Sequence, residues 1–238
     1  MKTCAVIMTA FESTDTILEA IYSLTEQSLP DNWQVKFYIG VDSCDKTATL
    51  LNKNNISYYY AKENVGTYIL SNSLIRKAYN DNCDIFVRFD SDDYACEEFL
   101  YRGIKNTDEK HVTTTKYIRC DEQLQPLLGI EPRTAKGSIF ISRFLLEKIG
   151  GYHHYRVSCD KYLLLRIKAL GYKGKAKLPP TYWYRTSATS LTGKKDTGLS
   201  SSYRENINLK LEESLKNKEF KINPVITDLE YQSNKGYK

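Results

Sequence analysis

The chain has 238 residues, 41% of them hydrophobic and 26% charged, and a formal net charge of +5. These values are ordinary for a soluble globular protein with enough chain to bury a core. No apolar run approaches the roughly 20 residues that span a bilayer, so we expect no transmembrane segment. The six cysteines lie far apart with no C-x-x-C pair, which favours free thiols in a reducing cytoplasm over disulfides or a zinc site. We therefore expect a cytoplasmic location.

Charge is distributed unevenly along the chain. Residues 1–132 hold 13 Lys and Arg against 20 Asp and Glu, whereas residues 133–185 hold 12 against 2. A block this basic suggests a polyanionic partner or the phosphates of a substrate. Electrostatic pairing between the basic block and the acidic half is the alternative.

Strand and helix signals alternate over the first half of the chain. Apolar runs predict strands at Cys4–Thr9, Val35–Val41, Ser57–Ala61 and Ile85–Phe89. Helical periodicity predicts helices between them, at residues 17–24, Lys46–Leu51 and Thr67–Tyr79. Ser13 or Thr14 is available as the N-cap of the first helix. This alternation is typical of an α/β fold with a Rossmann-like, mostly parallel sheet flanked by helices.

The regular alternation of strands and helices ends after the fourth strand. We expect a helix that starts near Ala95, and then strands at Val112–Arg119, Leu124–Leu128, Ser138–Ile141 and Tyr182–Tyr184. The expected helices of this part are Arg143–Ile149, Lys161–Leu170 and Leu199–Leu215. Residues 186–202 are predicted to form a long loop that could serve as a lid, and the last 15 or so residues a frayed tail.

Three carboxylates follow the fourth strand, in the stretch Asp90-Ser91-Asp92-Asp93. Ligands of open α/β sheets lie at the carboxyl ends of the strands, and crowded carboxylates need a cation or hydrogen-bond donors nearby. Hard divalent cations such as Mn²⁺ or Mg²⁺ take oxygen ligands and bridge them to substrate phosphates. The alternative is an acidic turn that caps the helix expected near Ala95.

Five segments carry a family resemblance in their order along the chain. They are Val6–Phe11, Tyr38–Thr47, Glu63–Gly66 with Asn72, Arg88–Asp93, and Gly137–Phe140 through Gly150-Gly151-Tyr152 to Asp160, Arg166 and Tyr172. Over about residues 3–192 the chain resembles the family 2 glycosyltransferases of GT-A fold, which are inverting and use nucleotide sugars. The resemblance implies a GT-A domain at 1–192, with a nucleotide-sugar half at 1–105 and a smaller acceptor half at 106–192. Residues 193–238 would form a lid loop, a C-terminal helix and a tail.

The resemblance also implies roles for single residues. The residues that bind the nucleotide sugar would be Thr9, Ala10, Phe11, Asp42, Asn64, Gly66, Asn72, Asp90, Ser91 and Arg185. Asp90 and Asp92 would be ligands of Mn²⁺ or Mg²⁺. The nucleobase of the donor would lie against Thr9, Ala10 and Phe11. Asp42 would accept from a base N–H, which favours a UDP-sugar, and a turn aspartate is its alternative interpretation.

Asp160 would be the catalytic base that takes the proton of the acceptor hydroxyl. It follows the Gly-Gly-aromatic segment and precedes a predicted helix, as the base does in the family. A helix N-cap is its alternative interpretation. Glu147 is the only other carboxylate within residues 133–185.

Two positions depart from the family pattern. Ser71 precedes Asn72 where many members carry an arginine, and Ser187 stands where many carry a histidine that completes the metal site. Arg185, Lys194 and Lys195 could supply part of the missing positive charge.

The acceptor stays open between a surface glycan and a hydroxymethylated base in phage-type DNA. The second would place the enzyme in a host cytoplasm, and it fits the tyrosines interleaved with the basic block. A sugar nucleotidyltransferase, or a non-catalytic module that binds nucleotide sugar or DNA, is the alternative function. Residues 10–16 lack the glycines and basic residues that a nucleotidyltransferase would be expected to show there. The sequence leaves the oligomeric state open.

Overall fold

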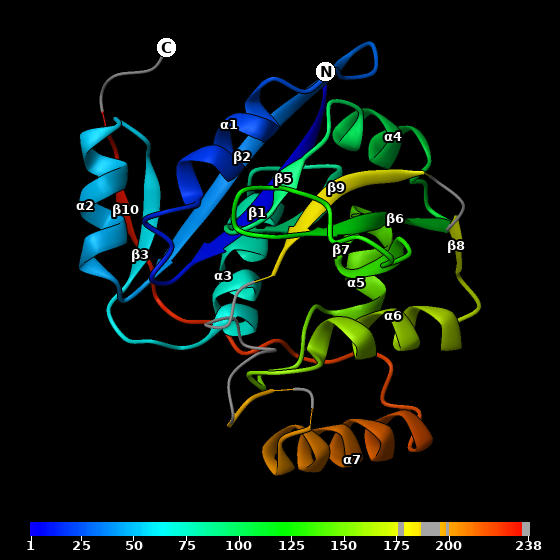
Figure 1. The fold of residues 1–238 in the computed structure, drawn as a ribbon. Coiled ribbons are helices and arrows are strands. Elements are labelled where there is room, and N and C mark those ends of the chain that lie inside the picture. The colour runs from blue at the N-terminus through cyan, green and yellow to red at the C-terminus, as the bar shows by residue number, and fades with distance from the viewer. Residues whose placement is uncertain (176–178, 187–195, 199, 235–238) are drawn as a thin grey trace.

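The computed structural model describes residues 1–175, 179–186, 196–198 and 200–234. Its strands are β1 (Lys2–Ala10), β2 (Trp33–Asp42), β3 (Tyr58–Ala61), β4 (Ile85–Asp90), β5 (Tyr94–Ala95), β6 (His111–Cys120), β7 (Arg133–Ser142), β8 (Lys173–Lys175), β9 (Pro180–Arg185) and β10 (Glu230–Gln232). Its helices are α1 (Ile17–Thr25), α2 (Asp45–Lys53), α3 (Thr67–Asn80), α4 (Phe99–Lys105), α5 (Arg143–Ile149), α6 (Cys159–Ala169) and α7 (Ser202–Lys216). Figure 1 shows helices on both faces of one twisted sheet.

The sheet has the order β10-β3-β2-β1-β4-β7-β6-β9-β5, with β8 also paired to β6. The strands of the first half, β3, β2, β1 and β4, are parallel to one another. The antiparallel pairing of β7 with β4 and with β6 then joins the second half to the same sheet. The predicted α/β fold with a mostly parallel sheet is therefore confirmed.

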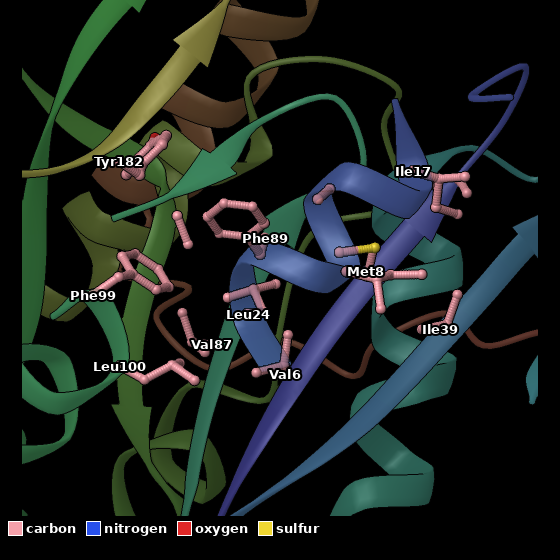
Figure 2. Close-up of a cluster of buried hydrophobic side chains, with 14 of the residues drawn as sticks. Val6, Met8, Ile17, Leu24, Ile39, Val87, Phe89, Phe99, Leu100 and Tyr182 are labelled. Atoms are coloured by element: carbon pink, nitrogen blue, oxygen red, sulfur yellow. The ribbon is translucent and has the colours of Figure 1, made fainter. Parts of the chain in front are cut away.

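Two apolar cores lie on the two faces of this sheet. Because side chains alternate along a strand, Cys4, Val6 and Met8 of β1 face one core, while Ala5 and Ile7 face the other. The first core packs against α1, α2 and α4, and the second against α3, α5 and α6. Figure 2 shows the first core, where side chains from β1, β4, α1 and α4 meet. Burial on both faces explains why β1 is apolar from Cys4 to Met8 and why β4 is apolar apart from Arg88 and the final Asp90.

Three local predictions are wrong. The chain after the acidic stretch forms the short strand β5, and the helix expected near Ala95 begins only at Phe99. The strand expected at Leu124–Leu128 is reduced to a single bridge between Cys120 and Pro126. The N-cap of α1 is Thr16, so neither Ser13 nor Thr14 takes that place. In the first case a contact distant in sequence decides the local structure, since β5 forms by pairing with β9.

The C-terminal segment is ordered within the described residues, contrary to the frayed tail expected from the sequence. After α7 the chain crosses beneath α6 and α3 and reaches the edge of the sheet (Figure 1), where β10 pairs antiparallel with β3. On the way, the Ile222 N–H donates to the Ile149 carbonyl and the Thr227 N–H to Ser73 Oγ. No helix among the described residues is long and apolar enough to cross a membrane. Most of the predicted lid loop, at 187–195 and 199, lies outside the described residues.

Candidate active site

The carboxyl ends of three adjacent parallel strands bring the first predicted site residues together. In the strand register, Thr9 of β1 stands opposite Gly40 of β2 and Asp90 of β4. Asp42 lies at the end of β2, two residues beyond Gly40. Phe11 follows β1 and is 45% exposed, which is high for a large aromatic side chain next to a buried strand. Thr9, Asp42 and Asp90 therefore lie at the ends of three neighbouring strands, and the exposed Phe11 follows the middle one.

Asp42 braces the turn that leads into α3. Its two carboxylate oxygens accept from the backbone N–H groups of Val65 (2.8 Å) and Gly66 (2.9 Å). Burial raises the pKa of Asp42, although these two N–H groups and Arg156 act in the opposite direction. Gly66 has φ +85°, which favours glycine, at the N-cap of α3. Asn64 Nδ2 donates to the Asp42 carbonyl at 3.4 Å. Asp42 therefore acts as a turn aspartate, which was its alternative interpretation, and its hydrogen bonds hold the loop at Asn64–Gly66.

Arg156 adds a cation to this loop, and no sequence motif marks it. Its Nη2 donates to the Asn64 carbonyl at 3.0 Å, and its Cγ would lie 3.4 Å from a Cβ placed on Gly66. The residue is exposed and comes from the segment between Gly151 and Asp160. A single basic residue in a basic block carries no signal of its own, so only the fold places it beside Asp42.

Arg88 is buried at the centre of the site. It donates to Asp90 Oδ2 (3.2 Å), to Thr67 Oγ1 (3.1 Å) and to the Gly137 carbonyl (3.3 Å). Thr67 Oγ1 in turn lies 2.7 Å from Thr9 Oγ1. A Cβ on Gly137 would stand 2.8 Å from Arg88 Nη2, so a side chain there would displace the guanidinium. Arg88 thus ties β1, α3, β4 and β7 together, and the sequence signal for it is an arginine inside an apolar strand.

The acidic stretch is tethered to α1 and β9. Ser91 Oγ lies 2.8 Å from Ser13 Oγ, and the Ser91 carbonyl accepts from Thr16 Oγ1 at 2.9 Å. Asp93 Oδ1 accepts from the Arg185 N–H at 3.1 Å.

The guanidinium of Arg185 pairs with Glu19, so this predicted donor-binding residue already has an acidic partner. The N-cap residue of α4 is Glu98, so Asp90–Asp93 does not cap that helix and the capping alternative is wrong.

The chemistry of the acidic stretch fits a hard divalent cation. Burial and the neighbouring Asp90 raise the pKa of Asp92 to about 6. Burial and Asp92 also raise the pKa of Asp93, whose Oδ2 is buried without a hydrogen-bond partner among the described residues. Such crowded oxygens favour a nearby positive charge. Within the described ranges no group of three or more His, Cys, Asp or Glu side chains could hold a metal, so Asp90 and Asp92 would need phosphate oxygens or water as further ligands. Ser187, Lys194 and Lys195 lie outside the described residues.

Asp160 is connected to the same centre through Tyr68. It lies in the first turn of α6, and its Oδ1 accepts from the Tyr68 hydroxyl at 3.1 Å. The N-cap of α6 is Ser158, so Asp160 is not the helix cap. Glu147, the other carboxylate of this part, accepts from Tyr79 at 2.7 Å. Tyr79 is eleven residues beyond Tyr68 on α3, about 16 Å along the axis, so Glu147 lies far from Arg88 and Asp90.

Asn72 lies where α3 meets Tyr152 and the C-terminal segment. It is 2% exposed, and its amide donates to the Tyr152 carbonyl (2.9 Å) and accepts from the Tyr152 N–H (2.9 Å). Its Nδ2 also donates to the Val225 carbonyl at 3.4 Å. A ligand would have to break these bonds to reach the amide, so we expect Asn72 to join α3 to Tyr152 and the C-terminal segment and not to bind the donor.

Asn72→Ala should therefore lower the free energy of unfolding by about 1–3 kcal/mol, because it leaves buried backbone groups of Tyr152 unpaired. Donor affinity of the folded variant should stay at the wild-type level. Chemical denaturation and equilibrium binding measure the two effects. Asn80→Ala, at an exposed position of the same helix, is the control and should change stability by less than about 0.5 kcal/mol. A stable Asn72→Ala variant that binds the donor weakly would show that Asn72 contacts the nucleotide sugar, as the sequence predicts.

Comparisons with known proteins agree with this fold. The family model described as Glycosyl transferase family 2 matches residues 5–170, which is more than half of the chain. No curated protein sequence matches the chain. Among solved structures the chain is similar to S. aureus TarS, and at the identities found this similarity shows the fold alone.

Two TarS structures illustrate the similarity. S. aureus TarS 1–349 in complex with UDP is 18% identical, with 79% of this chain and 61% of that chain covered and a TM-score of 0.61. The complex with UDP-GlcNAc is 15% identical, with 80% and 60% covered and a TM-score of 0.63. The chain thus spans about 60% of the length of these TarS chains. With its GT-A fold and the match over residues 5–170, the chain belongs to glycosyl transferase family 2.

Proposed function

We propose that the chain is an inverting, metal-dependent glycosyltransferase that moves a sugar from a UDP-sugar to an acceptor hydroxyl. The observation that carries this proposal is a single set of contacts joining two carboxylate groups. Arg88 pairs with Asp90, the Arg88 guanidinium lies 5.3 Å from the centre of the Tyr68 ring, and Tyr68 bonds Asp160. This arrangement supports single displacement, in which a base on the acceptor side takes the hydroxyl proton while the charge of the leaving group is neutralised on the other side.

The donor would lie along the carboxyl ends of β1, β2 and β4. The exposed ring of Phe11 offers a stacking face for the base, beside Thr9 and Ala10. Asp42 would accept from the base N–H, and Arg156 stands next to it as a further cation. Uracil is the base in the two TarS complexes, which supports UDP here.

The reaction would proceed by attack of the acceptor oxygen on the anomeric carbon. Asp160 would take the hydroxyl proton as the new C–O bond forms. The bond to the diphosphate breaks on the opposite face, and its electron pair leaves with the diphosphate. A divalent cation held by Asp90 and Asp92 would neutralise that leaving group. Arg88 holds Asp90 in place through the bond to Oδ2.

Nucleotide release tests the proposal. The protein is incubated with Mn²⁺ and, in separate reactions, with UDP-GlcNAc, UDP-glucose and their GDP or CDP counterparts. We expect free UDP from a UDP-sugar, formed slowly even with water as acceptor. A nucleotidyltransferase would instead form a sugar nucleotide from a sugar phosphate and a nucleoside triphosphate, and a non-catalytic module would bind the donor unchanged.

Two acceptor classes are consistent with the acceptor half, a surface glycan and a hydroxymethylated base in phage-type DNA. Beside the acidic stretch, the rings of Tyr117 and Tyr184 lie 5.0 Å apart and Arg119 lies 5.9 Å from the Tyr184 ring centre. Either a sugar ring or a base could stack on such a surface. Both acceptors would be modified in the cytoplasm, where UDP-sugars are made.

The charge of the basic block, residues 133–185, is the observation that supports DNA as a second candidate acceptor. Within the described residues, the pair Arg185–Glu19 is the one ion pair that joins this block to the acidic half. Internal pairing therefore accounts for little of its charge, and exposed basic residues such as Arg133 and Lys136 remain on the surface of β7.

If DNA is the acceptor, binding to fluorescent duplex DNA should fall steeply as salt rises. Reversing Arg133 and Lys136 to glutamate should reduce the slope of log affinity against log salt by about 1 for each phosphate that the protein no longer neutralises. Donor binding should not change. Lys2→Glu with Lys53→Glu makes the same charge change on the acidic half and should leave the slope nearer the wild type. Weak, salt-independent binding together with no turnover on hydroxymethylcytosine-containing DNA would assign the enzyme to glycan synthesis.

A further inference from the structure

Tyr68 is the side chain through which the donor side and the acceptor side of the site meet. It is the second residue of α3 and is 6% exposed. Its hydroxyl donates to Asp160 Oδ1 at 3.1 Å, across 92 residues of sequence. No motif in the sequence marks it, because its partner comes from another helix.

The ring of Tyr68 is held by two neighbours. The Arg88 guanidinium lies 5.3 Å from its centre, and the Tyr152 ring lies 5.3 Å away at an angle of 39°. Thr67, the preceding residue, accepts from Arg88 and contacts Thr9. The start of α3 is therefore fixed to the same groups that fix Asp90, and the Tyr68 hydroxyl has a defined direction.

The hydroxyl keeps its proton over the working pH range. Burial and the nearby Asp160 raise the pKa of Tyr68 well above its ordinary value. Tyr68 is therefore a hydrogen-bond donor to the carboxylate and does not compete with Asp160 for the acceptor proton.

We propose that Tyr68 is a positioning residue that orients the Asp160 carboxylate for proton transfer, an inference that rests on the proposed role of Asp160 as the base. Rotation of a carboxylate about its last side-chain bond is weakly restrained, so one hydrogen bond decides its orientation. With Oδ1 held by Tyr68, Oδ2 takes the proton of the acceptor hydroxyl. The hydroxyl oxygen of the acceptor then forms the new bond to the anomeric carbon. At the same time the bond from that carbon to the diphosphate breaks, and its electron pair leaves with the diphosphate.

Tyr68→Phe isolates the hydroxyl, because it keeps the ring and its contacts with Arg88 and Tyr152. We expect kcat for UDP-GlcNAc hydrolysis in Mn²⁺ to fall roughly ten- to hundredfold, with KM for the donor and the melting temperature near the wild type. Tyr79→Phe is the matched control, since it removes a tyrosine–carboxylate bond from the same helix at the distant Glu147 and should leave kcat unchanged.

A double-mutant cycle with Asp160→Asn separates positioning from a general effect on the site. If Tyr68 acts through Asp160, adding Tyr68→Phe to Asp160→Asn should not slow the residual reaction further. Wild-type kcat for Tyr68→Phe, or an equal loss in both backgrounds, would overturn the inference while leaving Asp160 as the base. Full activity of Asp160→Asn would instead remove the proposed base itself.

Discussion

Asp160→Asn should cut donor turnover by roughly two to four orders of magnitude while leaving UDP-sugar affinity close to that of the wild type. The amide keeps the shape of the side chain and can still accept from Tyr68, but it cannot take the acceptor proton. The loss should therefore appear in kcat and not in donor binding. UDP release under saturating donor, together with equilibrium binding of the donor, measures both quantities.

Glu147→Gln is the matched control for this experiment. Glu147 is the other carboxylate in residues 133–185, it is half-exposed, and it contacts Tyr79 and Arg143 away from the site. Donor turnover by the Glu147→Gln variant should equal that of the wild type. Near-normal turnover of Asp160→Asn, or a large loss with Glu147→Gln, would show that another group takes the proton.

Asp92→Asn should abolish the metal dependence of donor binding. In the presence of Mn²⁺, we expect its affinity for a UDP-sugar to fall roughly 10- to 100-fold, to the level that the wild type shows in EDTA. Titration of both proteins with donor, in Mn²⁺ and in EDTA, gives the comparison. Asp15→Asn, an exposed aspartate before α1, should behave as the wild type.

The same substitution should stabilise the fold. Because burial and Asp90 raise the pKa of Asp92 to about 6, its charge at pH 7 opposes folding. Removing the charge should raise the free energy of unfolding at pH 7 by on the order of 1 kcal/mol. The gain should shrink as the pH falls from 7 towards 5, since the wild-type carboxyl then takes up a proton in the folded state. A variant that is less stable and still binds donor in a Mn²⁺-dependent way would contradict the assignment.

The strands that carry the donor side could be predicted because they are buried on both faces. An apolar run that ends in a carboxylate is visible in the sequence at Asp42 and Asp90, and parallel packing then brings the two ends together. The end of the helix predicted at Arg143–Ile149 is also confirmed, since Gly150 follows it with a φ of +82°, which favours glycine.

The side-chain contacts that hold the site together could not be predicted, because each of them joins distant segments of the chain. Asn72 meets Tyr152 across 80 residues and Tyr68 meets Asp160 across 92. Local patterns contain no trace of such pairs. The same holds for β5 and β10, which are two and three residues long and form by pairing with β9 and β3. Strands this short carry too little periodicity to be recognised.

The anomeric configuration of the released sugar tests the central claim most directly. UDP-GlcNAc has an α-linked sugar, so single displacement by water, with Asp160 as base, should release the β anomer first. Proton NMR during the first minutes, at high enzyme concentration and with Mn²⁺, distinguishes the β anomer from the α anomer before they equilibrate. Initial β-GlcNAc together with an equal amount of UDP is the predicted result. Initial α-GlcNAc, or intact donor under conditions in which it is bound, would contradict an inverting glycosyltransferase.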